Sequence, residues 1–424
     1  MTRSTVLFVN TRPSPSEAEP CFRAARQLDL DVVLLADRPV AVPKGAYVEH
    51  VPVDSYDNQS LVAAAKACAN QRTVTGVVCW GDRDVEGTAH IAAALGLPGH
   101  TPAAAAGARN KAVFRESLAR AAPEITVRSR AIQRADREAL ASAASHVGFP
   151  AVLKPAGASS SKGIFRVDDI AALRQAADQL TAYTRPEMDP IFRFYPGLAL
   201  LEEFIEGSEH SVDGLLSDGE LIAATVTDKW VEPRHSLEYM QVHPSALAQQ
   251  TQDAALAAAR SAASAIGLGT GAFHLEFRVA PNQSLRVLEL NARTGGGYIT
   301  SHLIPLSCGW NFLAATLALA CQLEKPSSMP APYAVAGSRK LIANREGRFR
   351  ALDGIEKALS EPGICALILE RQLGAEALLP PRGYTEGALA SALAVGYSNS
   401  GVVSTLEAAT RSLEPVIIEA PVSE

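Results

Sequence analysis

The sequence predicts an α/β protein, with α+β character in part and more than one domain. Three observations lead to this prediction. Strand-like and helix-like segments alternate over the first hundred residues, which is typical of βαβ units around a parallel sheet. Further along, two strand-like segments flank a short polar turn, which is typical of an antiparallel hairpin. The chain of 424 residues is also too long for one ordinary domain.

The elements of the first region follow from its apolar runs and breakers. Strands are expected at 6–9, 32–36 and 76–80, and helices at 16–28, 59–69 and 88–95. The breaker Leu97-Pro98-Gly99 ends this unit. We therefore predict a βαβ domain over residues 1–108.

The remaining chain mixes helical and extended patterns. Helices are expected at 109–123 and 170–180, a strand at 198–204, and two strands within 268–291 around the turn Pro281-Asn282-Gln283-Ser284. The Pro-rich stretch 326–332 is typical of a linker. We therefore predict a second domain over 109–325 and a C-terminal domain over 326–424, with a turn at 396–401.

Composition excludes several classes of function. The hydrophobic share of 47% and charged share of 20% are those of a soluble globular protein. A net charge of −6 without a dense basic patch argues against a nucleic-acid partner. The apolar stretches are too short to span a bilayer, and the N-terminal residues lack the pattern of a signal peptide. Six scattered cysteines without a C-x-x-C pair suit reduced thiols, so we expect a cytoplasmic protein. A homodimer is the default assembly.

The hairpin carries the most informative chemistry. Strand side chains alternate between the two faces of a sheet, so Glu289 and Asn291 share a face. A turn centred on residues 282–283 places Glu276 opposite Glu289, and two like charges there destabilise a hairpin by up to roughly 1 kcal/mol. A divalent cation reverses that effect, and two carboxylates with an amide oxygen suit Mg²⁺. The alternative interpretation is a solvated polar face.

A second motif has the composition of a phosphate-binding loop. Lys154 follows the apolar run 150–153 and precedes a Gly/Ser-rich loop at 157–163, which contains Ser159, Ser160 and Ser161. Such a lysine offers a point charge to phosphate oxygens, and the loop offers N–H groups and hydroxyls. No Walker A string occurs, and a flexible surface turn is the commoner origin of an isolated loop of this kind.

In chain order these motifs resemble the ATP-grasp superfamily of carboxylate–amine ligases, over roughly residues 1–325. The matching segments are Asn110-Lys111, 149–155, the Ser-rich loop, 201–209, Lys229, and Glu276 with Glu289 and Asn291. Residues 289–299 are similar to the L-amino acid ligase branch, whose members make dipeptides or related amides. The resemblance implies an ATP-grasp fold with an N-terminal pre-ATP-grasp domain, a mobile lid and a small C-terminal domain.

The resemblance also implies roles for individual residues in binding ATP. Lys111 and Lys154 would contact the phosphates, and the loop with Ser159, Ser160 and Ser161 would close over them. Glu202 and the backbone of Glu203, Phe204 and Ile205 would bind the adenine edge, and Glu209 the ribose hydroxyls. Because an acyl phosphate hydrolyses readily, a lid at about 124–200 would exclude water.

The reacting groups would lie beyond the ATP phosphates. By the resemblance, Glu276, Glu289 and Asn291 would hold Mg²⁺, with Mn²⁺ as an alternative. Lys229 would lie near the transferred phosphate. Arg293 would face the substrate carboxylate or the acyl-phosphate oxyanion, because position 274 is His where D-alanine ligases have Arg.

The amine substrate would lie near the segment 230–244. His243 or His235 in this segment would bind an ammonium group or act as a base, although a structural histidine is the commoner case. Glu238 and Tyr239 in the same segment are further candidates. The predicted reaction is amide or dipeptide formation through an acyl phosphate, with release of ADP and phosphate and with ATP, a small acid and an amine as partners.

Three other functions remain open at this stage. One is an ATP-grasp ligase of another small acid, of purine-pathway or carbamoylating type, although the biotin carboxylase string N-x-R-x-Q-V-E-H is absent after Glu289. Another is a non-catalytic ATP-binding module. The third is an NAD-binding protein, against which the first strand is followed by residues 10–15 without G-x-G-x-x-G.

Overall fold

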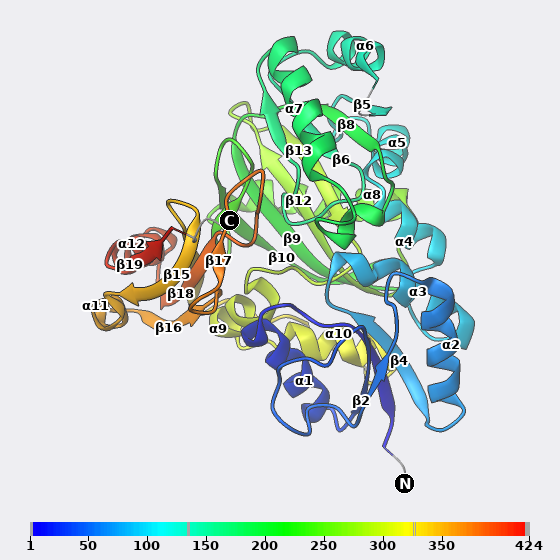
Figure 1. The fold of residues 1–424 in the computed structure, drawn as a ribbon. Coiled ribbons are helices and arrows are strands. Elements are labelled where there is room, and N and C mark those ends of the chain that lie inside the picture. Colours follow the sequence, from blue (N-terminus) through cyan, green and yellow to red (C-terminus); the bar gives the residue numbers. More distant parts are fainter. Residues whose placement is uncertain (1–2, 134–135, 325, 327, 420–424) are drawn as a thin grey trace, which may run out of the picture.

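The computed structural model describes residues 3–133, 136–324, 326 and 328–419 (Figure 1). Within this part of the chain, helices pack on four sheets, which confirms the predicted α/β class. The first residues of the chain, and Lys325 and Ser327 at the predicted linker, lie outside the described residues.

The N-terminal region folds as the predicted parallel sheet. Its strand order is β3 (Glu49–Pro52), β2 (Asp31–Ala36), β1 (Thr5–Val9) and β4 (Val74–Cys79), and its helices are α1 (Pro15–Gln27), α2 (Asn58–Ala69) and α3 (Val85–Leu95). Phe8, Phe22 and Trp80 stack in its core. The later helix α10 (Phe312–Ala320) returns to pack beside α1, so the chain closes this domain from its far end (Figure 1).

The predicted helix at 109–123 is confirmed as α5, which begins two residues later and follows a second helix directly. Helix α4 (Pro102–Arg109) ends at Asn110, and α5 (Lys111–Ala121) begins directly after it. The side chain of Asn110 accepts hydrogen bonds from the N–H groups of Ala112 (3.0 Å) and Val113 (3.4 Å). Such an N-cap satisfies donors at a helix start, and it fixes Lys111 at the first turn of α5.

A small antiparallel sheet forms the region predicted as a lid. Its strand order is β5 (Ser129–Gln133), β8 (Leu198–Glu203), β6 (Ala151–Pro155) and β7 (Phe165–Val167). Helices α6 (Arg137–Val147) and α7 (Ile170–Tyr183) pack on it, and the short helix η2 (Pro190–Arg193) precedes β8. This unit lies at the top of the molecule in Figure 1, above the largest sheet.

The largest sheet has eight strands in the order β13-β12-β9-β10-β11-β14-β18-β16. Their bounds are β9 (Ser208–Ser217), β10 (Glu220–Val231), β11 (Glu238–His243), β12 (Gly271–Val279), β13 (Leu285–Asn291), β14 (Val335–Ile342), β16 (Ile364–Leu369) and β18 (Ala388–Gly396). Helix α8 (Gln249–Ala265) packs on the β9–β10–β13 part. The predicted hairpin within 268–291 is confirmed.

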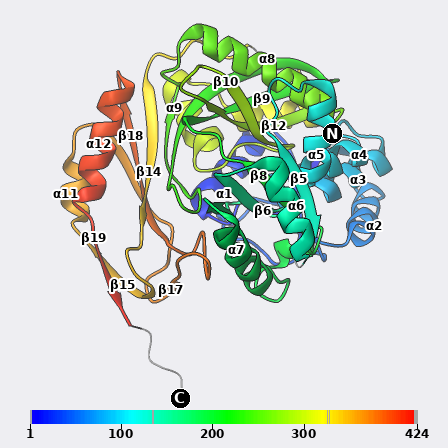
Figure 2. The ribbon, with the colours of Figure 1, turned by 90° about the horizontal axis from the view of Figure 1, so that it is seen from above.

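The C-terminal region shares this sheet, since β14 pairs with β11 along Met240–His243. Residues after the predicted linker therefore continue the second region. The other elements here are β15 (Gly347–Asp353), β17 (Glu376–Ala377), β19 (Glu414–Ile418), α11 (Ile355–Ser360) and α12 (Asn399–Arg411). Figure 2 shows α11 and α12 on the side of the molecule away from α2 and α3. The predicted turn at 396–401 connects β18 to α12, whose first turn is capped by Ser398.

Short elements complete the chain: η1 (Asp82–Asp84), η3 (Ile299–Leu303) and α9 (Ile304–Cys308). No single helix among the described residues is long and apolar enough to cross a membrane. One bent pair, Ile299–Cys308 with Phe312–Ala320 at 116°, passes that test by length and composition alone.

Two glycines of the C-terminal region provide a matched test of its packing. A Cβ on Gly354 (φ +81°) would lie 1.9 Å from the carbonyl oxygen of Ser412, whereas a Cβ on Gly374 (φ +88°) would meet nothing within 4 Å. Both alanine variants bear the left-handed backbone penalty of about 1–2 kcal/mol, but only Gly354→Ala adds a backbone collision. We expect Gly354→Ala to lower the free energy of unfolding by at least about 2 kcal/mol more than Gly374→Ala in urea titrations. Equal losses would contradict the close approach of α11 to Ser412.

Candidate functional site

The two carboxylates of the hairpin face each other as predicted. The antiparallel register of β12 and β13 pairs Glu276 with Glu289 and His274 with Asn291. A β-bulge follows Glu276, and beyond it the pairing resumes one residue out of step, with Phe277 opposite Val287. The predicted facing of Glu276 and Glu289 is confirmed, but the bulge as well as the turn brings the two carboxylates opposite each other.

Two lysines neutralise the facing carboxylates. Lys229 on β10 is almost fully buried, and its Nζ lies 2.6 Å from Glu276 Oε1 and 2.6 Å from Glu238 Oε2. Lys111 Nζ lies 3.2 Å from Glu289 Oε1. Burial raises the pKa of Glu276, but Lys229 and the bond to His274 outweigh burial and hold it well below its usual range. The structure thus brings together two lysines and two carboxylates that lie far apart in the sequence.

His274 belongs to the same cluster through a residue that sequence reasoning missed. Its Nδ1 lies 3.0 Å from Asp213 Oδ1, and its Nε2 lies 3.3 Å from Glu276 Oε1. Burial lowers the pKa of His274, but the carboxylate of Asp213 outweighs burial and raises it. Asp213 also accepts the N–H of Gly295 at 3.0 Å, so it links the imidazole to the glycine-rich loop after β13.

Arg293 is fixed by Asp82, another residue absent from the predicted set. Asp82 lies in η1 after β4, and it accepts from Arg293 Nε at 2.9 Å and from Nη2 at 2.8 Å. Burial raises the pKa of Asp82, but Arg293 dominates and lowers it to about 2. Asp82 could have been found from the sequence by its position just after the carboxyl end of a parallel strand, where binding sites in α/β sheets form.

The amide of Asn291 points at two carboxylates. With its nitrogen turned toward them, it donates to Asp82 Oδ1 (2.9 Å) and to Glu289 Oε1 (3.0 Å). In the opposite orientation its carbonyl oxygen faces the same acceptors, an arrangement that a cation among these oxygens stabilises. The donor set of two carboxylates and an amide therefore fits a hard divalent ion. Among the described residues, no group of three or more His, Cys, Asp or Glu side chains is disposed to hold a metal.

Lys154 and Glu202 form a buried pair below the predicted phosphate loop. Lys154 Nζ lies 2.7 Å from Glu202 Oε2, and Arg115 Nε donates to Glu202 Oε1 at 2.6 Å. Burial raises the pKa of Glu202, but the two cations lower it to about 2. Since both carboxylate oxygens bind cations, the structure gives Glu202 a different environment from the expected adenine edge. Arg115 also donates to the carbonyls of Val287 and Leu288, which ties the small sheet to β13.

The other predicted nucleotide residues gather around Arg278. Its Nε and Nη2 donate to Glu209 Oε2 at 3.0 and 2.9 Å, and its Nη1 donates to Ile205 O at 2.8 Å. Its guanidinium carbon also lies 5.0 Å from the ring centroid of Phe204. Glu203 instead faces outward and accepts from the exposed Arg128 at 2.8 Å. The residues that follow β8 and the side chain of Glu209 therefore lie together around Arg278.

The Gly/Ser-rich loop lies directly beside the lysines. Lys111 Nζ donates to Ala158 O at 2.5 Å, and Arg109 Nη2 donates to Gly157 O at 2.6 Å. Further along, the carbonyl of Ser159 accepts the N–H of Lys162 at 3.2 Å. The next two residues, Ser160 and Ser161, both have a left-handed backbone (φ +58°). The loop is thus a folded turn that lies against Lys111, one of the candidate phosphate-binding lysines.

His243 makes its hydrogen bonds outside the cluster of lysines and carboxylates, which favours the structural alternative over its predicted catalytic role. Its Nε2 lies 2.7 Å from Thr225 Oγ1, and its Nδ1 lies 2.6 Å from Ser307 Oγ. Burial lowers the pKa of His243 to about 4, so the ring is neutral at physiological pH. With both ring nitrogens occupied by hydroxyl groups, His243 is a structural histidine.

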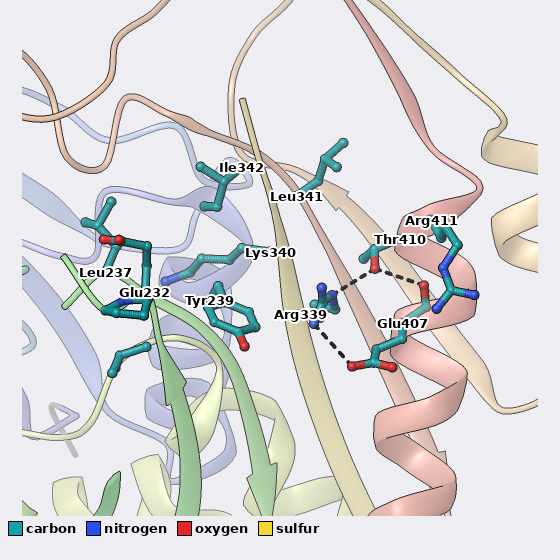
Figure 3. A pocket seen from close by; sticks show the side chains of 12 residues that line it. Glu232, Leu237, Tyr239, Arg339, Lys340, Leu341, Ile342, Glu407, Thr410 and Arg411 are labelled. Carbon is teal, nitrogen blue, oxygen red and sulfur yellow. Dashed lines mark hydrogen bonds and ion pairs between the residues drawn. The ribbon is translucent and has the colours of Figure 1, made fainter. Parts of the chain in front are cut away.

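A cavity of about 710 Å³ lies beside the predicted substrate segment (Figure 3). It is lined by Val231, Glu232, Pro233, Leu237, Tyr239, Arg339, Lys340, Leu341, Ile342, Glu407, Thr410 and Arg411. In Figure 3, Arg339 points toward α12, where its Nε donates to Thr410 Oγ1 at 2.9 Å. The cavity contains none of the carboxylates and lysines of the site, although Lys340 Nζ lies 3.9 Å from Glu238 Oε1.

The buried pair at Glu202 makes stability depend on pH. Its pKa in the folded protein is about 2 against an ordinary 4.5, so its contribution is complete above about pH 5 and is lost as pH falls toward 2. We expect the difference in unfolding free energy between the wild type and Glu202→Gln to shrink by roughly 3 kcal/mol over this range. Glu203→Gln is the matched control, because its partner is exposed and surface ion pairs contribute little. A difference that stays constant with pH for Glu202→Gln would contradict the pairing.

Comparisons with known proteins agree with this geometry. A family model of the ATP-grasp N-terminal domain matches residues 22–99, and one of the ATP-grasp domain matches residues 147–302. Among solved structures, the L-amino acid ligase from Bacillus licheniformis superposes with a TM-score of 0.82 at 21% identity over 99% of both chains. Phosphoribosylglycinamide synthetase from Anaerococcus prevotii superposes with a TM-score of 0.69 at 13% identity over 99% of this chain and 100% of that chain. At these identities the superpositions establish the fold.

Relatives by sequence extend the match. The uncharacterised protein y4rH of Sinorhizobium fredii is 27% identical over 86% of this chain and 73% of its own length. Carnosine synthase 1 of Gallus gallus is 29% identical over 79% of this chain and 38% of its own length. Alanine–anticapsin ligase of Bacillus subtilis is 26% identical over 48% of this chain and 44% of its own length, so the match spans less than half of either ligase. The chain therefore belongs to the ATP-grasp superfamily, and its relatives of named activity match the L-amino acid ligase branch.

Proposed function

We propose that this protein is an ATP-dependent ligase that joins a carboxylate to an amine through an acyl phosphate, releasing ADP and phosphate. One observation carries the proposal. Lys229 and Lys111 bind the facing carboxylates Glu276 and Glu289 at one end of the β12–β13 hairpin, with Arg293 just beyond it. Cations and carboxylates placed in this way suit a reaction that moves a phosphoryl group between oxygens.

The nucleotide would lie between the small sheet and the hairpin. The backbone of residues 203–205 would bind the adenine, and Glu209 would bind the ribose hydroxyls with its position set by Arg278. Lys154 and Lys111 would contact the ATP phosphates, and the loop 157–163 would cover these phosphates. Glu202 has a supporting role in this account, because it orients Lys154 and offsets its charge.

Glu276, Glu289 and Asn291 would hold Mg²⁺, with Mn²⁺ as an alternative. Their oxygens fit a hard cation, and the ion supplies charge neutralisation between phosphate oxygens when it is bound. Lys229 and Lys111 pair with the same carboxylates in the structure. Phosphate oxygens would be a second set of partners for these two lysines.

The chemical step follows from charge. A carboxylate is a poor electrophile, and phosphorylation turns one of its oxygens into a good leaving group that an amine displaces through a tetrahedral oxyanion. Arg293 is the candidate donor to that oxyanion. Three of its five N–H groups bind Asp82 and the carbonyl of Thr294, so two remain for the substrate. Asp82 thus sets the direction in which the guanidinium presents them.

The proposed substrates are amino acids. The relatives of named function are carnosine synthase 1 and alanine–anticapsin ligase, and the fold of the L-amino acid ligase from Bacillus licheniformis covers the whole chain. A purine-pathway acid is the competing substrate class, because N5-carboxyaminoimidazole ribonucleotide synthetase superposes with a TM-score of 0.72 at 13% identity. We further propose a cytoplasmic location, since all six cysteines are free thiols.

The direct test is ADP release by the purified protein with ATP and Mg²⁺, across pairs of the twenty amino acids, with mass spectrometry of the products. We expect ADP release that requires two amino acids and a product of dipeptide mass. Turnover that requires another acid would keep the ligase and reject the amino-acid substrates. Nucleotide binding without turnover on any acid and amine would reject the ligase.

Arg293→Ala tests the assigned oxyanion donor. Loss of one such donor lowers kcat by roughly 10²–10³-fold in other enzymes, and we expect a loss of this size with ADP affinity unchanged. Arg286→Ala is the control, because this residue lies on β13 shortly before Arg293 and its Nη1 donates to the exposed carbonyl of Glu124. An Arg293→Ala variant with the kcat of Arg286→Ala would remove Arg293 from the mechanism.

A further inference from the structure

The outer side of the phosphate loop is bound to a segment outside the lid. Ser161 Oγ donates to the carbonyl of Ser236 at 2.7 Å, and the N–H of Arg166 donates to the carbonyl of Arg234 at 3.4 Å. Both acceptors lie in the connection between β10 and β11. The lid sheet and the eight-stranded sheet share no strand, so these side-by-side contacts join two separate sheets.

His235 is the centre of this contact. Its Nδ1 lies 3.3 Å from the carbonyl of Ile164, and its ring packs edge-on against Phe165 of the lid with centroids 5.8 Å apart. On its other side it packs edge-on against Tyr384, with centroids 6.4 Å apart. Tyr384 belongs to the C-terminal region. The imidazole of His235 therefore lies between Phe165 of the lid and Tyr384, which is more than two hundred residues after Phe165 in the chain.

Tyr384 also reaches the loop itself. The side chain is buried, and its hydroxyl lies near the backbone of Gly163. Among the described residues this hydroxyl has no hydrogen-bond partner. Tyr384 therefore packs between His235 and Gly163 of the loop, where it can hold the loop in place.

The segment that presents His235 is held by hydrogen bonds to the side chain of Glu232. Glu232 accepts the N–H of Arg234 at 2.7 Å and the N–H of His235 at 2.8 Å. The same hairpin carries Lys229 on β10 and Glu238 on β11, which are paired at 2.6 Å. The surface that holds the loop is therefore built on the strands that hold the candidate phosphate lysine.

We propose that His235 and Tyr384 are positioning residues that hold the phosphate loop in its closed place, so that the C-terminal region takes part in nucleotide capture. This inference rests on the proposed function for the reaction in which the loop takes part. The contacts themselves are few and short-ranged, which suits a loop that must open for each nucleotide. At its other end, the same loop is held by Arg109 and Lys111, so only the outer contacts need to break for opening.

Limited proteolysis of the full chain tests the proposal without any turnover. Trypsin cleaves after Lys162 and Arg166, and both lie in or next to the loop. We expect His235→Ala and Tyr384→Ala to raise cleavage at these two bonds by roughly fivefold or more relative to cleavage elsewhere in the chain, with ADP slowing it. Tyr397→Ala is the matched control, because Tyr397 lies in the same C-terminal region with 96% of its surface exposed.

One conservative variant separates positioning from general destabilisation. His235→Phe keeps the edge-on ring contacts, and we expect loop cleavage to stay within about twofold of the wild type. If cleavage elsewhere rises equally in the alanine variants, the effect is global unfolding and the proposal fails. Loop cleavage equal to that of Tyr397→Ala also overturns it. In steady-state assays we expect a raised KM for ATP with kcat nearly unchanged for Tyr384→Ala, whereas a loss of kcat alone would contradict a positioning role.

Discussion

The arrangement of the site depends on the repulsion between two carboxylates held opposite each other. Glu276 and Glu289 face across β12 and β13, and two like charges in this position destabilise a hairpin by up to roughly 1 kcal/mol. The fold offsets this with Lys229 from β10 and Lys111 from α5. Each lysine comes from a different element. The need to neutralise the two carboxylates therefore ties together the hairpin, strand β10 and the first turn of α5.

The same constraint explains why the N-terminal sheet belongs to the site. Asn291 and Arg293 extend the hairpin strand beyond the carboxylates, and both meet Asp82 at the end of β4. Removing one partner from a buried ion pair leaves an uncompensated charge, at a cost of about 3–5 kcal/mol. Asp82 and Arg293 therefore tie the N-terminal sheet to the guanidinium of Arg293. The return of α10 onto the N-terminal sheet holds the same two regions by apolar packing.

The local parts of this structure could be predicted from the sequence, and the long-range parts could not. Strand alternation and a turn near residues 282–283 were enough to predict the pairing of Glu276 with Glu289, although the β-bulge after Glu276, which also sets this register, left no signal in the sequence. Asp82 and Asp213 were missed because each acts on a partner that lies at least sixty residues away, and such contacts leave no periodic pattern. Glu202 was assigned to adenine from its motif, whereas its partner Arg115 is set by the packing of α5.

The C-terminal region shows the same limit. A Pro-rich stretch predicted a boundary, but strand pairing between β11 and β14 continues the main sheet beyond it. Pairing between distant strands depends on which edge is free in the folded protein, and composition does not report that. By contrast, the helix expected at 109–123 is present as α5, because Asn110 favours the cap position and fixes where the helix begins.

The central claim is that Glu276 and Glu289 exchange their lysine partners for a divalent ion when nucleotide binds. Isothermal titration calorimetry of ADP with and without Mg²⁺ tests it most directly, in the wild type and in the double variant Glu276→Gln/Glu289→Gln. The account predicts that Mg²⁺ tightens ADP binding by roughly tenfold or more in the wild type, about 1.4 kcal/mol, and leaves it unchanged in the double variant. The same Mg²⁺ dependence in both proteins would contradict the account.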